Sequence, residues 1–231
     1  AVHRLSETPG LRVVLLDDRP AWLPAGPAPT TVAALLPFVR GHSAGFDQWR
    51  DRGNRGWGYG DVLPSFKRLE RYEAGASEHR GGSGPLSVAH CWDPHPGHRT
   101  FLQACVSGGF HQDSRHDFNG PRSQSVAGYC QKATRDDRPH GFDAAFLDPA
   151  RARGAVTVDG GHVTRIRFEG QRAVGVEYLR GGNRVTVPAA RAVVLAAGPV
   201  RAAQLLMLSG IGPAAHLKSL GVALVADRAG V

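Results

Sequence analysis

The sequence predicts an α/β fold with a parallel sheet, and one stretch near the carboxyl end carries most of that prediction. Ala192–Ala196 form a short, uniformly apolar run, which is more typical of a fully covered parallel strand than of a half-exposed one. Gly198 then permits close approach of the backbone, and Pro199 prevents the strand from continuing. Residues 202–208 supply a helix that the glycines of residues 209–213 end. This order is typical of nucleotide-binding α/β domains, although a strand, turn and helix of any other α/β protein fit these residues equally well.

A second apolar strand is predicted at Leu11–Asp17, and it ends in an acid. In a dinucleotide-binding βαβ unit, the acid at the end of the second strand accepts hydrogen bonds from the adenosine ribose. Asp17 is therefore a candidate ribose ligand. The alternative interpretation is an ordinary solvated acid at a strand end.

The remaining segments predict a mixed pattern of helices and short strands. Helices are expected at residues 2–7, 47–49, 61–73, 100–108 and 142–152, with Asp61 as the N-cap of the third and Pro64 in its first turn. Short strands are expected at residues 156–158, 163–168, 173–179 and 184–187, separated by glycine-containing turns. The polar, glycine-rich link 74–84 suggests a change of domain.

Composition narrows the classes of function. The chain has 231 residues and a formal charge of +8, but its arginines are scattered among acids and it has three lysines, so nucleic-acid binding is not expected. No apolar run approaches the ~18 residues of a membrane helix, and the first residues do not resemble a secretory signal. Cys91, Cys105 and Cys130 form a sparse, odd set that suits reduced thiols, and a cytoplasmic protein is therefore expected.

One segment gathers metal-ligand types within a few residues: His90, Cys91, His95 and His98. Their spacing matches no zinc pattern, and Pro94, Pro96 and Gly97 are expected to interrupt any helix there. No metal site is predicted.

Several long blocks resemble one family in the same order along the chain. LLMLSGIGPAAHLKSLGV, Leu205–Val222, resembles the second signature of the glucose-methanol-choline (GMC) oxidoreductases. Val39–Glu73 resembles the same family, and further blocks continue the resemblance at Arg80–Val88, Asp117–Tyr129 and Val156–Leu179. The chain is identified as a member on these motifs. The resemblance implies an α/β, FAD-binding Rossmann-like domain (doubly wound, three-layer), incomplete, with an inserted α+β segment of the substrate-domain side.

The resemblance also implies an organisation and an activity. Residues 1–75 would be the first part of the FAD-binding domain, 76–150 a connector and substrate-side segment, and 151–231 the second part. The implied reaction is FAD-dependent oxidation of the CH–OH group of a choline-like or primary alcohol, with hydride transfer to flavin N5.

Cofactor contacts carry over onto individual residues. The resemblance assigns Val163 a main-chain contact with the FAD adenine, and expects Ala197 and Gly198 to pass close to the nucleotide beside Asp17. Thr30 and Thr31 fall on the serine positions of a phosphate-contacting run. Ala34 and Leu35 stand where the family has Asn-Gly against the flavin, so this chain departs from the pattern there.

The family's remaining motifs are expected outside the chain. The first strand and its GxGxxG turn would precede Ala1, and the catalytic histidine with its His or Asn partner would follow Val231, so no catalytic residue is assigned here. The chain alone is therefore expected neither to retain FAD tightly nor to oxidise alcohols. The alternative hypothesis is a catalytically silent relative that binds a nucleotide or a partner.

Overall fold

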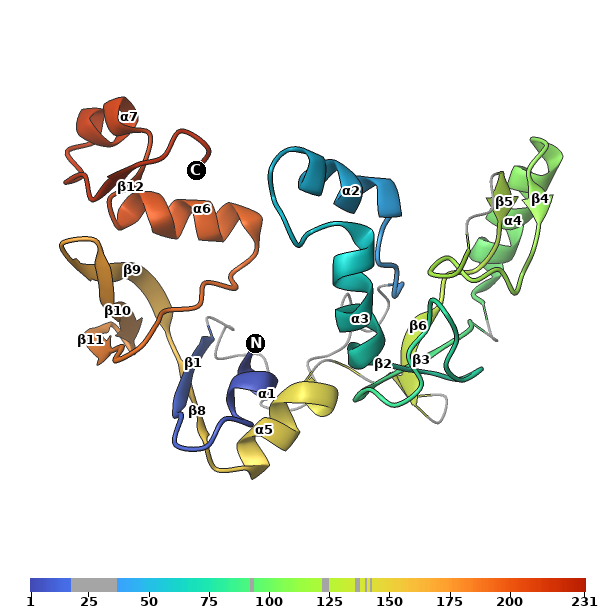
Figure 1. Cartoon of the computed structure of the whole chain (residues 1–231), viewed down its shortest axis with the longest axis horizontal. Helices are drawn as coiled ribbons and strands as arrows, with labels where there is room; N and C mark the ends of the chain where they lie inside the picture. The colour runs from blue at the N-terminus through green and yellow to red at the C-terminus, as the bar shows by residue number, and fades with distance from the viewer. Residues whose placement is uncertain (18–36, 92–93, 122–124, 136–137, 140, 142) are drawn as a thin grey trace. The chain divides into compact units, whose positions relative to one another are not determined.

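The computed structural model describes the chain apart from residues 18–36, 92–93, 122–124, 136–137, 140 and 142. It divides into two compact units (Figure 1). Unit 1 comprises Ala1–Leu23 and Arg153–Val231, and unit 2 comprises Pro24–Ala152. The two units are defined by which residues contact one another and not by function. The functional division expected at residues 75 and 150 therefore stays a prediction. Among the described helices, none has the length and apolar character needed to cross a membrane.

Unit 1 begins with helix α1 (Val2–Leu5) and the predicted strand β1 (Val13–Asp17). β1 pairs in parallel with β8 (Val156–Gly160), so that Val13 lies opposite Val156 and Asp17 opposite Gly160. A parallel pair joins segments that are far apart in the chain. Here it joins the amino-terminal segment to the part of unit 1 that begins at Arg153.

An antiparallel meander follows in unit 1. It has the strand order β11-β10-β9, formed by β9 (His162–Glu169), β10 (Arg172–Arg180) and β11 (Asn183–Pro188). The glycine turns predicted from the sequence lie between these strands, with Gly170, Gly181 and Gly182 at positive φ. Exposure alternates along the second half of β11, where Val185 and Val187 are half-buried and Thr186 is exposed, as expected for a strand with one covered face.

Helix α6 (Pro199–Leu208) lies alongside β9 (Figure 1). It leads into the short strand β12 (Ile211–Gly212) and helix α7 (Ala214–Ser219). β12 pairs in parallel with β13 (Ala226–Asp227). The helix predicted at residues 202–208 and its glycine end are confirmed.

The strand predicted at Ala192–Ala196 is wrong in this structure. The segment pairs with no other strand of the described chain, and Val194 is 59% exposed. An apolar run becomes a covered parallel strand only where neighbouring strands supply its hydrogen bonds, and no described segment does so here.

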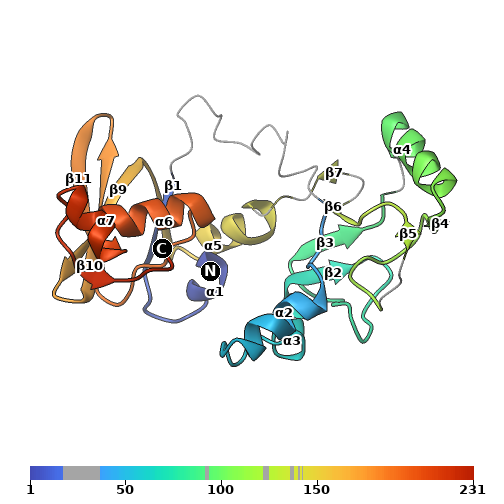
Figure 2. The same ribbon diagram turned by 90° about the horizontal axis from the view of Figure 1, so that it is seen from above.

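Unit 2 contains a four-stranded sheet with the order β2-β3-β6-β7 (Figure 2). Its strands are β2 (Glu70–Tyr72), β3 (Leu86–Ala89), β6 (Lys132–Arg135) and β7 (Arg138–Pro139). β2 and β3 run parallel, whereas β3 and β6 run antiparallel. The core of the unit gathers Tyr72, Leu86, Val88 and Ala145.

Two helices precede this sheet, α2 (Ser43–Asp51) and α3 (Tyr59–Leu69). Asp61 was expected as the N-cap of the second helix, but Gly58 is the cap. The Asp61 carboxylate accepts a hydrogen bond from the Gly58 amide at 3.0 Å, so the acid stabilises the helix start from the third position. Pro64 consequently lies inside the helix, beyond its first turn.

The rest of unit 2 comprises α4 (Pro96–Ser107), β4 (His111–Gln112), β5 (Val126–Ala127), a π-helical turn at Asp143–Leu147 and α5 (Asp148–Ala152). The expectation that Pro96 and Gly97 interrupt any helix is wrong. Pro96 is the first residue of α4, where its missing N–H costs nothing, and the His95 ring nitrogen Nδ1 accepts from the Gly97 amide at 3.1 Å.

Candidate cofactor-binding site

Asp17 lies where the sequence predicts it, at the carboxyl end of β1. Its carbonyl oxygen accepts a hydrogen bond from the Gly161 amide at 3.2 Å, one residue beyond the end of β8. In open α/β sheets, ligands bind beyond the carboxyl ends of the parallel strands. The half-buried Asp17 carboxylate therefore belongs to an edge that suits a ligand.

The turn between β8 and β9 is tightly packed. A Cβ atom on Gly161 would lie 2.5 Å from Tyr178 Cδ2 and 2.6 Å from the Leu179 carbonyl oxygen, so only glycine fits. The Tyr178 hydroxyl donates to Asp159 Oδ2 at 2.5 Å, and Arg180 forms an ion pair with the same carboxylate oxygen. These contacts fix the position from which β9 departs.

Val163 follows this turn, opposite Tyr178 in the β9–β10 register. Its carbonyl oxygen accepts a hydrogen bond from Arg201 Nη2 at 2.7 Å, and the same nitrogen lies 3.0 Å from His162 Nε2. Arg201 is the third residue of α6, so its side chain joins the start of the helix to the start of β9. The peptide group expected to contact adenine is thus already bonded within the protein.

Ala197 and Gly198 immediately precede α6. Gly198 has φ +80° and ψ 165°, a conformation available almost only to glycine, and no atom lies within 4 Å of the place of a Cβ. Glycine is required here by the backbone conformation and not by a close neighbour. Ala197 and Gly198 are both exposed.

The SGIGP motif after α6 is structural. The Ser209 hydroxyl donates to the Leu205 carbonyl oxygen at 2.5 Å and accepts from the Ile166 amide at 2.8 Å, so it joins α6 to β9. A Cβ on Gly210 would lie 2.4 Å from the Ala223 carbonyl oxygen. The Gly210 carbonyl accepts from the amides of Val225 and Ala226 at 2.8 and 3.1 Å.

Four of the six predicted cofactor residues, Asp17, Val163, Ala197 and Gly198, lie in the described part of unit 1, and their cofactor contacts stay predictions. Thr30 and Thr31, with Ala34 and Leu35, lie outside the described residues. The sequence interpretation missed Arg201, Asp159 and Tyr178. Arg201 lies within the predicted strand-turn-helix stretch, and its place in the first turn of the helix was the available signal.

A buried ionic cluster lies in unit 2. Glu70 Oε1 lies 2.5 Å from Arg40 Nη2 and 3.2 Å from Arg80 Nε, and accepts from the Gly81 amide at 2.9 Å. Arg80 Nη1 lies 3.3 Å from Asp117 Oδ1. Burial raises the pKa of Glu70 and lowers the pKa of Arg80. These groups mainly bind one another and join the first residue of β2 to the segments around Arg40, Arg80 and Asp117.

The histidines of residues 90–98 have separate structural contacts, apart from the His95 and His98 rings, which lie edge to face with centroids 6.0 Å apart. His90 Nε2 lies 2.7 Å from the Tyr72 hydroxyl, while His95 caps α4. Within the described ranges, no three His, Cys, Asp or Glu side chains are arranged to hold a metal ion.

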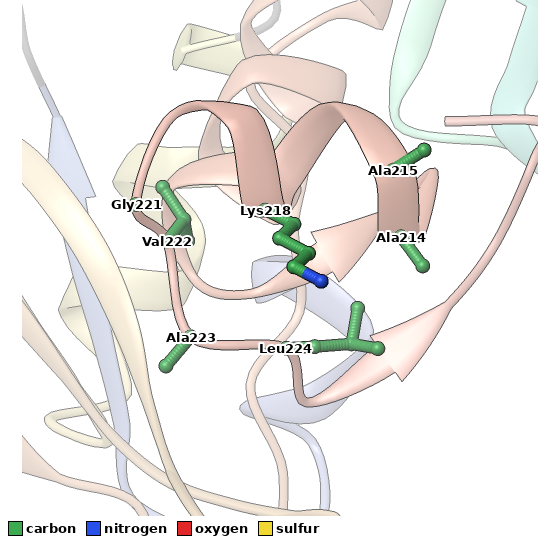
Figure 3. A pocket seen from close by; sticks show the side chains of 7 residues that line it. All are labelled: Ala214, Ala215, Lys218, Gly221, Val222, Ala223 and Leu224. Atoms are coloured by element: carbon green, nitrogen blue, oxygen red, sulfur yellow. The ribbon is translucent and has the colours of Figure 1, made fainter.

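A shallow groove beside α7 contains none of the predicted cofactor residues (Figure 3). It is lined by Ala214, Ala215, Lys218, Gly221, Val222, Ala223 and Leu224. The side chain of Lys218 extends toward Leu224 and is the one charged group on an otherwise apolar lining.

Comparison with known proteins agrees with the resemblance found in the sequence. The family model described as GMC oxidoreductase matches residues 15–227, which is most of the chain. The chain belongs to the GMC oxidoreductase family.

Among curated relatives, the chain is 42% identical to the oxygen-dependent choline dehydrogenase of Brucella ovis over 194 residues, which cover 84% of the chain and 35% of that protein. It is 36% identical over 219 residues to the human mitochondrial choline dehydrogenase, covering 94% of the chain and 36% of that protein. The chain thus spans about a third of the length of these relatives.

Solved structures support the predicted fold class. The pyridoxine 4-oxidase of Mesorbium loti matches with a TM-score of 0.71 at 30% identity, covering 83% of the chain and 38% of that structure. An FAD-dependent oxidoreductase from Chaetomium thermophilum matches with a TM-score of 0.70 at 27% identity, covering 84% of the chain and 36% of that structure. The predicted α/β fold of an incomplete FAD-binding domain is confirmed at this level.

Proposed function

We propose that this chain forms the FAD-binding part of a flavin-dependent oxidoreductase that acts on CH–OH groups, with choline as the first substrate to test. The observation that carries the proposal is the path from Asp17 through Gly161 to Val163 and, by way of Arg201, to the start of α6 at Gly198. Choline is chosen because the most similar curated relatives given above are choline dehydrogenases.

The residues on this path fit the adenosine half of FAD in their chemistry. A carboxylate such as Asp17 accepts hydrogen bonds from ribose hydroxyls, and the backbone at Gly198 is open on the side where a Cβ would stand. Arg201 donates to the Val163 carbonyl and so holds the start of α6 against β9, which fixes the place of the Gly198 backbone. No metal is needed for these contacts.

FAD, when bound, supplies a hydride acceptor for the carbinol carbon of the alcohol. The contribution proposed for this chain is to bind and orient the nucleotide end. Asp17 would hold the ribose, the exposed Ala197–Gly198 backbone would lie along the nucleotide, and the β8–β9 turn would fix the distance between them. No proton transfer is assigned to a residue of this chain.

The alternative, a silent relative that binds a nucleotide or a partner, has two observations in its favour. The Val163 carbonyl is bonded to Arg201, and Ala192–Ala196 lack a strand partner within the described chain. Arg201 occupies one of the two acceptor positions of that carbonyl and so competes with an adenine amino group for it.

Titration of FAD with the purified chain, followed by quenching of flavin fluorescence, tests the binding step. We expect weak, saturable binding with a Kd on the order of 10 µM or higher, because few contacts to the nucleotide are present. Asp17→Asn should weaken binding about tenfold, since it removes a charge-assisted hydrogen bond. Glu169→Gln, an exposed acid at the other end of β9, is the matched control and should change nothing. Absence of saturable binding contradicts the proposal.

A chimera tests the activity. The chain replaces the matching segment of the Brucella ovis enzyme, and bound flavin and choline oxidation are measured. Retained FAD with turnover supports the oxidoreductase, whereas a folded chimera that retains FAD and lacks turnover supports the silent alternative. A folded chimera without flavin contradicts both the cofactor assignment and the activity.

A further inference from the structure

The register of β3 and β6 brings two cysteines face to face. Val88 lies opposite Ala133 and Ala89 opposite Lys132 in this antiparallel pair. The next facing residues are His90 and Gln131, and their side chains meet, with His90 Nδ1 3.2 Å from Gln131 Nε2. Cys91 and Cys130 lie one step further, beyond the ends of both strands, and continuation of the register would place them opposite each other.

Facing residues of an antiparallel pair project from the same side of the sheet, with Cα atoms ~4.5–5.5 Å apart. Disulfides span Cα separations of about 4.4–6.8 Å, so residues that face each other in such a register are within reach of a disulfide. Both thiols are free and half-buried. Burial raises the pKa of the Cys130 thiol, and the neighbouring Cys91 contributes to the same shift, as expected for two sulfurs in proximity.

We propose that Cys91 and Cys130 are a dithiol site that a peroxide oxidises to a reversible disulfide. The thiolate of one cysteine attacks hydrogen peroxide, which gives a sulfenic acid and, after protonation, one water. The second thiolate attacks that sulfur and forms the S–S bond, and the hydroxyl leaves as a second water. The two thiols together lose two electrons and two protons, and the peroxide gains them. Two equivalents of an external thiol reverse the step.

The third cysteine has no comparable partner. Cys105 lies within α4, a helix whose contacts are with β4 and β5. Three ligands that could hold a metal ion are not found together anywhere in the described ranges, so the pair is assigned as a redox pair and not as part of a metal site.

The bond would join two strands beside the core of unit 2. His90, next to Cys91, contacts the Tyr72 hydroxyl, and Gln131, next to Cys130, donates to the His116 carbonyl oxygen at 2.8 Å. Oxidation would therefore hold together the strand ends from which this network extends, and reduction would release them.

The folded and the unfolded chain should form different disulfides, which allows a direct test. In an unfolded chain, ring closure favours short loops, so Cys91–Cys105 should form about five times more often than Cys91–Cys130. The folded register predicts the opposite preference. The chain is treated with hydrogen peroxide, blocked with an alkylating reagent, and its disulfides are assigned by peptide mass mapping, in buffer and in guanidinium chloride.

In buffer, we expect Cys91–Cys130 to be the main disulfide, with a loss of two mass units that dithiothreitol reverses. Cys105→Ser should form the same bond at an unchanged rate, and Cys130→Ser should lose two mass units at least tenfold more slowly. The rate should rise with pH, because the raised pKa keeps Cys130 protonated at neutral pH. A main product of Cys91–Cys105 in buffer, or no intramolecular disulfide at all, overturns the proposal.

Discussion

Removal of the Ser209 hydroxyl should destabilise unit 1 much more than removal of a similar hydroxyl on its surface. Ser209 is 8% exposed, and its oxygen accepts from the Ile166 amide at 2.8 Å. In Ser209→Ala, that amide loses its partner in a buried position. The Leu205 carbonyl keeps a partner, because the Ser209 amide also donates to it at 3.1 Å.

The loss in free energy of unfolding can be estimated from these two hydrogen bonds. A buried amide left without a partner costs about 1–3 kcal/mol, and the Leu205 carbonyl adds little. We expect the free energy of unfolding to fall by about 2 kcal/mol. For a chain of this length, that corresponds to a decrease in Tm of about 4–8 °C.

Ser219→Ala is the matched control. The Ser219 hydroxyl also donates to a carbonyl oxygen, that of His216 at 2.8 Å, but it is exposed and water can replace the bond. Its loss should change stability by no more than about 0.5 kcal/mol. Thermal unfolding followed by circular dichroism measures both variants, and hydrogen exchange should show the Ile166 amide less protected in Ser209→Ala. Equal Tm changes in the two variants would refute the reasoning.

Three further changes probe the same unit. Gly161→Ala places a Cβ 2.5 Å from Tyr178 Cδ2 and should cost about 1–3 kcal/mol by thermal unfolding, whereas Gly160→Ala, with open space around it, should cost less; equal costs would contradict the packing. The Arg165 hydrogen bonds to Glu177, at 2.8 and 3.0 Å, lower the pKa of Glu177 below its ordinary value of 4.5. This carboxylate therefore stabilises the fold above pH 4.5, and the stability is lost as pH falls through the folded pKa, so Tm measured between pH 5 and 3 should depend less on pH in Glu177→Gln than in the unchanged chain. Arg201→Ala frees the Val163 carbonyl and should tighten FAD binding in the fluorescence titration; unchanged or weaker binding would show that Arg201 does not compete with the nucleotide.

Local patterns predicted much of the fold. The apolar run that ends at Asp17 and the glycine-separated strands of residues 156–187 lie close to where the sequence indicates, because strand period and turn residues act over a few neighbours. The helix at residues 202–208 was predictable for the same reason.

Long-range pairing was not predictable in this way. Ala192–Ala196 have the composition of a covered strand, but a strand needs partners that composition does not supply. Arg201 was overlooked because its contact with the Val163 carbonyl joins segments that are far apart in the sequence. The helix start at Pro96 was missed because proline was given only its helix-breaking role, although it is favoured in the first turn.

The SGIGP motif has a consequence for how the family evolves. Ser209 and Gly210 hold a helix, a strand and a later segment together through a hydroxyl and a carbonyl, and neither needs a cofactor for that task. Selection for a stable fold is then sufficient to keep Ser209 and Gly210 unchanged. A descendant that had lost its chemistry would preserve the motif as faithfully as a working enzyme, and the residues that diverge first would be those, such as Asp17, whose proposed task is to bind the nucleotide.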